Sequence, residues 1–231
     1  SLLKHLRAGG TAVVPAGDEL IAARVPARLR VATFGPGGDV DALPAGLRVG
    51  VPGSRLSAHM RRNALAALAA ARAAGLEPRG VVDVALSELR GQRHELPDGT
   101  VVVNDCYNAN PMSMRAALDD LAASAPGRRV AVLGDMLELG PGERRFHEEI
   151  GAHAAACGVE LLVAVGPRAR AIASGYGGAG EVHEAAGAAA AAALVPGLLR
   201  AGDTVLVKAS RGMALEAVVA ALEPPPRTPA G

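Results

Sequence analysis

Short apolar runs alternate with helix-like stretches through the second half of this chain, and this rhythm constrains its fold more than any other feature. The runs are continuous and rich in Val and Leu, as expected of parallel strands that are buried on both faces. They cover residues 101–103, 130–133, 161–165 and 205–207, and a further short strand is expected at 181–183. Helices are predicted at 112–124, 142–157, 167–174, 185–200 and 213–222. This order predicts an α/β fold with a doubly wound, mostly parallel sheet.

The first half is less regular and is interrupted by Gly and Pro. Strands are predicted at 11–14 and 29–34, a helix from residue 59 that is strongest over 63–74, and a second helix over 81–89. A strand, a tight turn and another strand are predicted over 94–103. We place a domain boundary near residue 98 and expect residues 224–231 to form a loose tail.

The chain opens with Ser1 and what looks like the end of a helix that Gly9 and Gly10 stop. We therefore expect it to be a fragment of a longer protein.

Composition excludes several classes of function. The net charge is +1 and the chain has two Tyr, two Phe and no Trp, so neither bulk charge nor an aromatic platform favours nucleic acid. Cys106 and Cys157 are too few for a disulfide framework and lack the spacing of a metal site, which indicates a reducing cytoplasm. The Ala-rich run at 187–194 is too short to span a bilayer.

Polar residues or Gly-Pro follow four of the predicted strands. Because ligands bind at the carboxyl ends of parallel strands, these segments are expected to face one cleft. They are residues 104–110, 134–138, 166–167 and 208–211. A carboxylate such as Asp105 can bind ribose hydroxyls, and the two cations around Ser210 could form an anion or carboxylate site.

Each of these features also has a simpler explanation. The Asx-rich turn at 105–110 can be helix capping alone, and residues 208–211 can be a solvated loop. His59, His147 and His153 are predicted on helix surfaces rather than as ligands. Cys106 has no basic neighbour in the sequence, which argues against a catalytic thiol.

Three motifs carry a resemblance to a known family. The segment 105–114 reads DCYNANPMSM, 134–140 reads GDMLELG with His147 downstream, and 208–213 reads KASRGM. In this order they resemble signatures of the Mur ligase family of ATP-dependent amide ligases, closest to its D-alanyl-D-alanine-adding members. The similarity covers most of residues 91–222. Residues 10–14, 32–35 and 59–65 resemble, more weakly, the end of the family's central ATPase domain.

The resemblance implies an organisation and a reaction. Residues 1–97 would be a remnant of an α/β central ATP-binding domain, and 98–223 a Rossmann-like C-terminal ligase domain. The parent would use ATP and Mg²⁺ to join D-Ala-D-Ala to UDP-MurNAc-tripeptide, in the peptidoglycan synthesis that supports cell shape and division. It would be a monomer of the bacterial cytoplasm, with no nucleic-acid partner and no membrane insertion.

The resemblance also implies roles for individual residues. Nucleotide contacts would come from Asn63, Arg93 and Asp105; the domain junction would be lined by Tyr107, Asn108 and Asn110; and the peptide substrate or the dipeptide would be held by Lys208, Ser210 and Arg211. No catalytic residue and no metal ligand is assigned within the chain.

No Gly-rich phosphate loop ending in Lys-Ser or Lys-Thr occurs in the 231 residues. The family supplies that loop and its magnesium ligands from earlier segments, so this chain is expected to be inactive alone. Met60 also stands where the family's HNxxNAL motif has Asn, and the segment between residues 39 and 59 is short. Two alternatives remain: a sister amide ligase such as folylpolyglutamate synthetase, and a non-catalytic binding module derived from a Mur ligase.

Overall fold

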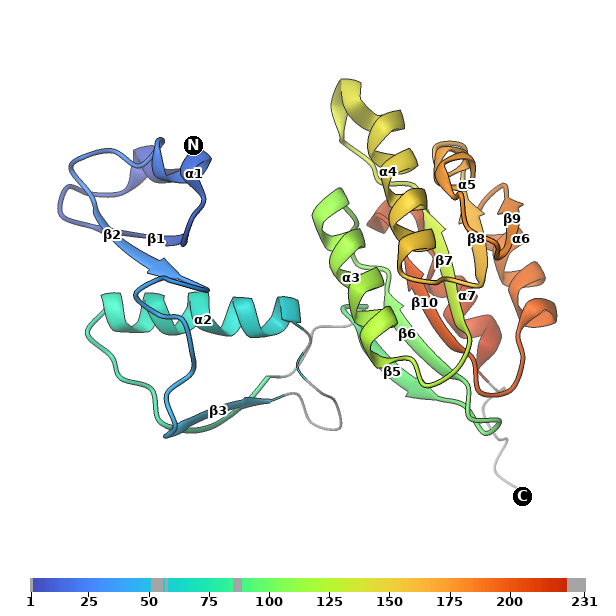
Figure 1. The fold of residues 1–231 in the computed structure, drawn as a ribbon, viewed down its shortest axis with the longest axis horizontal. Helices are drawn as coiled ribbons and strands as arrows, with labels where there is room; N and C mark the ends of the chain where they lie inside the picture. The colour runs from blue at the N-terminus through green and yellow to red at the C-terminus, as the bar shows by residue number, and fades with distance from the viewer. Residues whose placement is uncertain (1, 51–55, 57, 85–88, 224–231) are drawn as a thin grey trace, which may run out of the picture. The chain divides into compact units, whose positions relative to one another are not determined.

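The computed structural model describes residues 2–50, 56, 58–84 and 89–223. The chain divides into two compact units, residues 1–85 and 86–231, each of which has its own sheet structure (Figure 1). Within the described residues, no helix is long and apolar enough to cross a membrane.

The second unit is built on one six-stranded sheet, in the order β5-β6-β10-β7-β8-β9. Its members are β5 (Gln92–Glu95), β6 (Val101–Asp105), β7 (Arg129–Gly134), β8 (Leu161–Val165), β9 (Glu181–Ala185) and β10 (Thr204–Lys208). All neighbours run parallel except β5, which forms an antiparallel hairpin with β6. The prediction of a mostly parallel, doubly wound sheet is confirmed.

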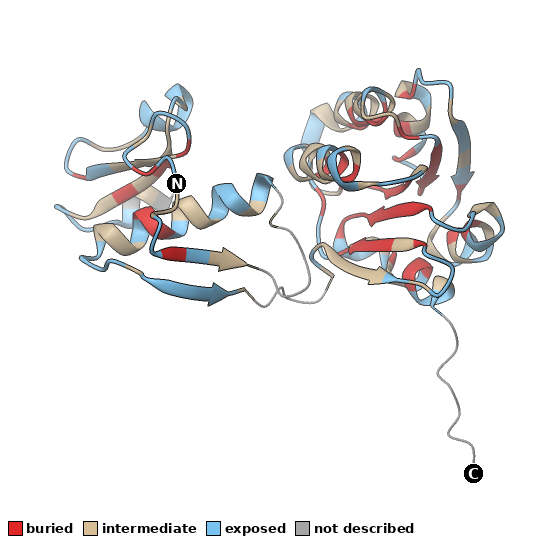
Figure 2. Cartoon of the chain, turned by 60° about the horizontal axis from the view of Figure 1, so that its bottom comes forward, coloured by how far each residue is buried: buried red, intermediate tan, exposed pale blue. Residues whose placement is uncertain are grey.

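Helices cover both faces of this sheet (Figure 1). One face carries α3 (Pro111–Ser124), α4 (Glu143–Ala156) and α5 (Arg170–Gly175); the other carries α6 (Ala188–Leu194), the 3₁₀ segment η3 (Val195–Leu198) and α7 (Glu216–Leu222). Strand β7 shows why its apolar run is continuous: Ala131 and Leu133 pack on the first face, whereas Val130 and Val132 pack on the second. The buried residues of Figure 2 therefore concentrate in the sheet and on the helix sides that face it.

The first unit contains two short parallel pairs, β1 (Thr11–Pro15) with β2 (Arg30–Phe34), and β3 (Leu47–Gly50) with β4 (Gly80–Asp83). A short helix, α1 (Glu19–Ala22), and a 3₁₀ segment, η1 (Leu2–His5), complete its first part. The long helix α2 (Ala58–Ala73) buries Leu68 and Ala69 against Val40 and Leu47.

The predicted helix over 81–89 is wrong where the structure describes it. Residues 80–83 form β4 instead, and 85–88 lie outside the described residues. Val81 and Val82 are β-branched and suit a strand, and β4 pairs with β3, a strand that the sequence did not predict. The single helix predicted over 185–200 is divided, because β9 extends to Ala185 and Pro196 lies in a 3₁₀ segment.

The division between the units falls twelve residues before the boundary near 98 that we expected from the sequence. The reason is the hairpin: Gln92–Glu95 pairs with the first strand of the large sheet, so it belongs to the second unit. Sequence alone places a turn between these strands but does not say on which side the domain ends.

Candidate functional site

The carboxyl ends of β6, β7, β8 and β10 meet at one edge of the sheet, which we call the carboxyl edge. The register places Lys208, the last residue of β10, opposite Asp105 of β6 on one side and Leu133 of β7 on the other. Gly134 of β7 lies opposite Val165 of β8. The predicted convergence of the polar strand ends follows from this topology.

A buried cation joins two of these ends. The Lys208 side chain is 2% exposed, and its Nζ lies 2.6 Å from Asp105 Oδ2. Nζ also donates to the backbone carbonyl of Asn108, at 2.9 Å. Because a buried ammonium is costly unless it is paired and hydrogen-bonded, these contacts explain how the lysine is accommodated. Lys208 therefore holds the loop after β6 in place.

The loop after β6 ends in a capped helix. Asn110 is the N-cap of α3: its Oδ1 accepts from the Ser113 backbone amide at 2.9 Å, and the Ser113 hydroxyl accepts from the Asn110 amide at 3.1 Å. Pro111 follows as the first helical residue. Asn108 and Tyr107 are exposed, and the Arg90 guanidinium lies 4.0 Å from the centre of the Tyr107 ring.

Ser210 connects three loops of the edge. Its buried hydroxyl accepts from the Leu137 amide at 2.9 Å and contacts the Ala109 carbonyl at 3.4 Å. Its backbone amide donates to the Asp135 carbonyl at 3.1 Å. The segments after β6, β7 and β10 are therefore bound to one another around a single side chain.

Two buried residues that the sequence analysis did not assign hold the loop after β7. Asp135 accepts from the backbone amides of Arg168 and Ala169, at 3.0 and 2.7 Å, and so joins this loop to the one after β8. His147 is fully buried; its Nε2 accepts from the Met136 amide at 2.9 Å while its Nδ1 donates to the Glu143 carbonyl at 2.8 Å.

The prediction that His147 lies on a helix surface is therefore wrong. The buried residues of α4 are His147, Ile150, Gly151 and Ala154, which recur at helical spacing. The histidine continues the apolar stripe toward the helix N-terminus, and this spacing was the signal that could have placed it inside.

Among the charged residues predicted to bind nucleotide or substrate, Arg211 is the one whose side chain faces water. Its side chain is 56% exposed and forms an ion pair with Glu216 of α7. The hydrogen bond that Arg211 donates to the Glu216 carboxylate raises the pKa of Arg211. Partial burial alone would raise the pKa of Glu216, but its hydrogen bond with Arg211 leaves that pKa lowered. The guanidinium therefore stays charged at the surface of the edge, where it can meet a carboxylate or phosphate.

The remaining predicted residues lie elsewhere. Arg93 of β5 binds α3, with a guanidinium nitrogen 2.8 Å from Asp120 Oδ2 and 2.7 Å from the Ser124 hydroxyl. Asn63 lies on α2 of the first unit, 3.3 Å from His59 Nε2. Cys106 is buried at the edge, and burial raises the pKa of its thiol to about 12, so it is not a nucleophile at neutral pH.

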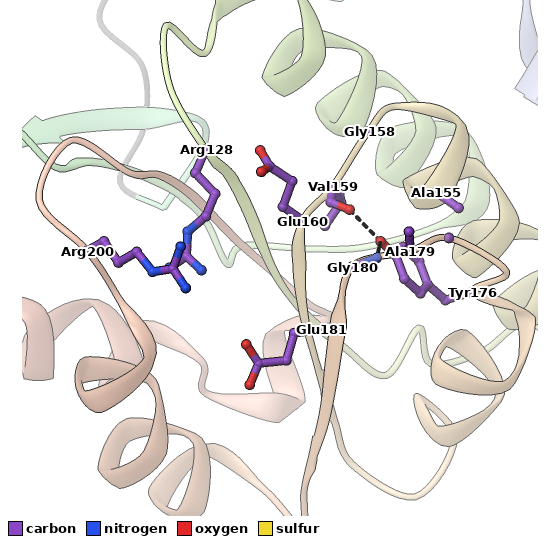
Figure 3. A pocket seen from close by; sticks show the side chains of 11 residues that line it. Arg128, Ala155, Gly158, Val159, Glu160, Tyr176, Ala179, Gly180, Glu181 and Arg200 are labelled. Carbon is purple, nitrogen blue, oxygen red and sulfur yellow. Dashed lines mark hydrogen bonds between the residues drawn. The ribbon is translucent and has the colours of Figure 1, made fainter.

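A pocket of about 450 Å³ lies at the opposite edge of the sheet, near the amino ends of β7, β8 and β9 (Figure 3). Its charges are mixed: Arg128 and Arg200 face Glu160 and Glu181. Arg128 is already paired with buried Asp203 at 2.8 Å. The pocket has no consistent charge and lies away from the motif residues, so the carboxyl edge is the better candidate site.

Comparisons with known proteins bear on the same region. The sequence model of the family described as "Mur ligase, glutamate ligase domain" matches residues 89–211. Among curated proteins, the UDP-N-acetylmuramoyl-tripeptide–D-alanyl-D-alanine ligase of Synechocystis is 36% identical over 201 residues, 82% of this chain and 44% of that protein. The chain spans about two fifths of the length of the curated relatives it matches.

Solved structures of several ligases resemble the fold. The MurF ligase from Thermotoga maritima in complex with ADP is 22% identical with a TM-score of 0.79, and the match covers 96% of this chain and 55% of that one. A folylpolyglutamate synthase from Mycobacterium tuberculosis is 19% identical with a TM-score of 0.59, over 93% of this chain and 56% of that one. At these identities both likenesses concern the fold alone.

Proposed function

Because the chain belongs to the Mur ligase family, we propose that it is the C-terminal part of an ATP-dependent, ADP-forming peptide ligase that adds D-alanyl-D-alanine to UDP-MurNAc-tripeptide. The observation that carries the proposal is the meeting of three motif segments, 105–114, 134–140 and 208–213, around Lys208 and Ser210. Segments that are distant in sequence and meet at the ligand-binding edge of a parallel sheet are expected to serve one site. The name of the curated Synechocystis relative supports the choice of substrates.

The proposed reaction has two steps. ATP phosphorylates a carboxylate of the tripeptide, which gives an acyl phosphate and ADP. The amino group of D-Ala-D-Ala then attacks the acyl carbon, loses a proton and displaces phosphate, which leaves a new amide bond. Both steps depend mainly on positioning and charge neutralisation rather than on a covalent role for the protein.

We assign the substrate-holding role within the edge chiefly to Arg211. Its guanidinium is exposed and can pair bidentately with a carboxylate. Lys208 and Ser210 would position the site rather than contact the substrate, because their polar atoms already bind loops of the same edge. Tyr107, Asn108 and Asn110 line the surface that would close on the central domain.

Nucleotide contacts from Asn63, Arg93 and Asp105 belong to the same proposal. Arg93 and Asp105 are engaged by Asp120 and Lys208, so nucleotide binding has to compete with these contacts or share them.

The two aspartates of the carboxyl edge, Asp105 and Asp135, do not fit Mg²⁺. Asp105 is paired with Lys208, and Asp135 accepts from two backbone amides, so neither offers a free carboxylate. The chain also contains no phosphate loop. We therefore assign ATP phosphates and Mg²⁺ to a part of the ligase outside these 231 residues, and expect the chain alone to be inactive.

The test compares this chain with a longer reading frame of the same gene. ADP release is measured with ATP, Mg²⁺, UDP-MurNAc-tripeptide and D-Ala-D-Ala, and again with each substrate omitted. The longer protein should release ADP only when all are present, and this chain should release none. Turnover by this chain alone would refute the assignment of phosphate chemistry to other residues. A longer protein without a phosphate loop would refute the ligase proposal.

The alternatives have distinct signatures in the same assay. A folylpolyglutamate synthetase would replace the two peptidoglycan substrates by a folate and glutamate. A non-catalytic module, which the change to Met60 favours slightly, would release no ADP in any form and would give no heat with adenine nucleotides in calorimetry. If the ligase proposal holds, the protein acts in the bacterial cytoplasm, where these precursors are made.

A further inference from the structure

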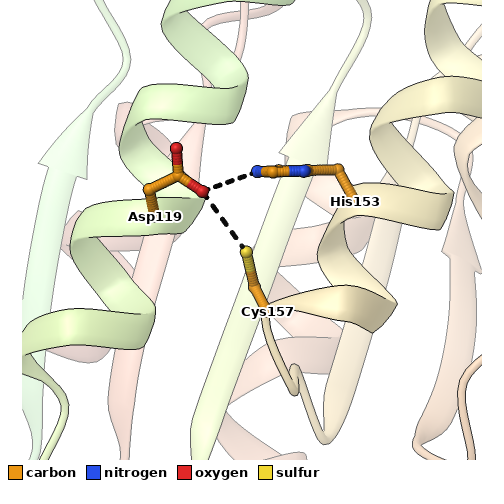
Figure 4. Close-up of side chains that lie close together, drawn as sticks. All are labelled: Asp119, His153 and Cys157. Atoms are coloured by element: carbon orange, nitrogen blue, oxygen red, sulfur yellow. Dashed lines mark hydrogen bonds and ion pairs between the residues drawn. The ribbon is translucent and has the colours of Figure 1, made fainter.

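Helices α3 and α4 bring three different potential metal ligands together (Figure 4). Asp119 of α3 offers a carboxylate, His153 of α4 an imidazole, and Cys157, the C-cap of α4, a thiol. The ligand atoms all lie within 4.8 Å of one another. We propose that these three residues form a Zn²⁺-binding site.

The local structure explains how the ligands converge. His153 and Cys157 are four residues apart on α4, so they lie on the same face of its last turn. The Cys157 amide donates to the His153 carbonyl at 2.9 Å, which keeps the turn helical to its end. Packing of α3 against α4 brings in Asp119, which is 34 residues before His153 in the chain.

The distances from the Asp119 carboxylate to the other two ligand atoms are near those of a tetrahedral zinc site. Zinc binds oxygen and nitrogen at about 2.0–2.2 Å and sulfur at about 2.3 Å, which sets neighbouring ligand atoms about 3.3–3.7 Å apart. Cys157 Sγ is 3.7 Å from Asp119 Oδ1. His153 Nε2 is hydrogen-bonded to the same oxygen at 2.7 Å. Zinc would replace this hydrogen bond, and the two atoms would have to move apart by about half an ångström. Three protein ligands leave a fourth position for water.

The chemistry of the donors selects the metal. A thiolate and an imidazole favour zinc, whereas Mg²⁺ and Ca²⁺ prefer oxygen ligands. The Asp119 and His153 side chains are 63% and 22% exposed, so an ion can reach them. The negative end of the α4 dipole also favours a cation there. The Arg129 guanidinium donates to the Cys157 carbonyl at 3.2 Å, and its positive charge opposes the binding of a cation.

The chain supplies a matched control. His183 and Glu181 form another histidine–carboxylate pair at 2.6 Å, and their side chains are 29% and 54% exposed. Among the described residues, Asp119, His153 and Cys157 form a cluster of three potential ligands, and His183 and Glu181 are not part of it. His183→Ala therefore removes an equivalent histidine without touching the proposed site.

The experiment is calorimetric titration of the untagged 231-residue chain with ZnCl₂, and with MgCl₂ in parallel. We expect one Zn²⁺ per chain and no Mg²⁺ binding at the same concentrations. Asp119→Asn, His153→Ala and Cys157→Ser should each weaken Zn²⁺ binding at least tenfold, while His183→Ala leaves it unchanged. Circular dichroism confirms that each variant is folded.

A second readout needs no substitution. Zn²⁺ should slow alkylation of Cys157 by iodoacetamide in the wild-type chain, as measured by mass spectrometry of the labelled peptide. Co²⁺ should give a thiolate charge-transfer absorption that Cys157→Ser abolishes. Absence of stoichiometric Zn²⁺ binding, or binding that persists in all three ligand variants, would overturn the proposal, as would unchanged alkylation at saturating Zn²⁺. None of these measurements depends on ligase activity.

Discussion

At the residue scale, the pair of Lys208 and Asp105 is the most consequential contact of the carboxyl edge. Replacing Lys208 by Met removes a buried charge and leaves the Asp105 carboxylate, whose side chain is 24% exposed, without its partner. Breaking such a pair from one side costs about 3 kcal/mol of unfolding free energy, somewhat less where water reaches the remaining charge. Urea unfolding followed by circular dichroism measures the change.

The double variant Asp105→Asn with Lys208→Met is the control for this prediction. It removes both charges, so much of the lost unfolding free energy should return. If the single and double variants are equally unstable, the loss comes from packing of the lysine stem rather than from the uncompensated carboxylate.

Arg211 gives the opposite expectation, with little change in stability and a large change in activity. Its side of the ion pair with Glu216 is exposed, and exposed ion pairs contribute little to stability. Arg211→Ala should therefore leave the unfolding midpoint nearly unchanged. In the longer, active enzyme it should lower kcat/KM roughly tenfold or more, since a hydrogen bond to a charged group contributes about 1.5–3 kcal/mol. Steady-state ADP release measures this.

Glu216→Gln is the matched variant for Arg211. It weakens the same ion pair but keeps the guanidinium, so activity should stay near that of the wild type. An equal loss of activity in both variants would mean that the pair itself, rather than a contact of Arg211 with substrate, matters for turnover.

At the element scale, the capping box of α3 links the family motif to helix stability. Asn110→Ala removes the side-chain acceptor for the Ser113 amide, and loss of an N-cap typically costs about 1 kcal/mol. Asn110→Ser keeps a capping oxygen and should lose much less. Chemical denaturation of both variants distinguishes them; equal stability of the alanine and serine variants would contradict a capping role.

Strands and helices of the second unit could be predicted because both faces of the sheet are covered, which forces apolar runs and amphipathic helices into the sequence. The pairing of β3 with β4 could not, because these strands are short and β4 is exposed along its whole length. The alternation of apolar and polar positions that marks a half-buried strand is therefore absent, and the β-branched side chains of Val81 and Val82 were the one local feature that favoured a strand.

The candidate site was predictable to the same extent. Strand order alone brings Asp105 and Lys208 to one edge. The hydrogen bonds that Lys208 and Ser210 make there also depend on the conformation of the loops after the strands. The role of Asp135 depends on the loop after β8, which is 33 residues away from it. The zinc ligands show the same limit, since the spacing of His153 and Cys157 is visible in the sequence but the approach of Asp119 is not.

At the scale of the whole molecule, the two units should differ in stability. Among the residues that the structure describes, the two apolar clusters of the second unit contain seventeen and sixteen buried residues, whereas those of the first unit contain four and three. Since burying one large apolar side chain contributes about 1.5–3 kcal/mol, the first unit has much less to offset its chain entropy. Amides of β1–β4 and α2 should therefore exchange with solvent far faster than those of β6, β7, β8 and β10. Native-state hydrogen exchange with mass spectrometry measures both sets in one sample. Equal protection of the two units would contradict this expectation, because it would mean that they unfold together.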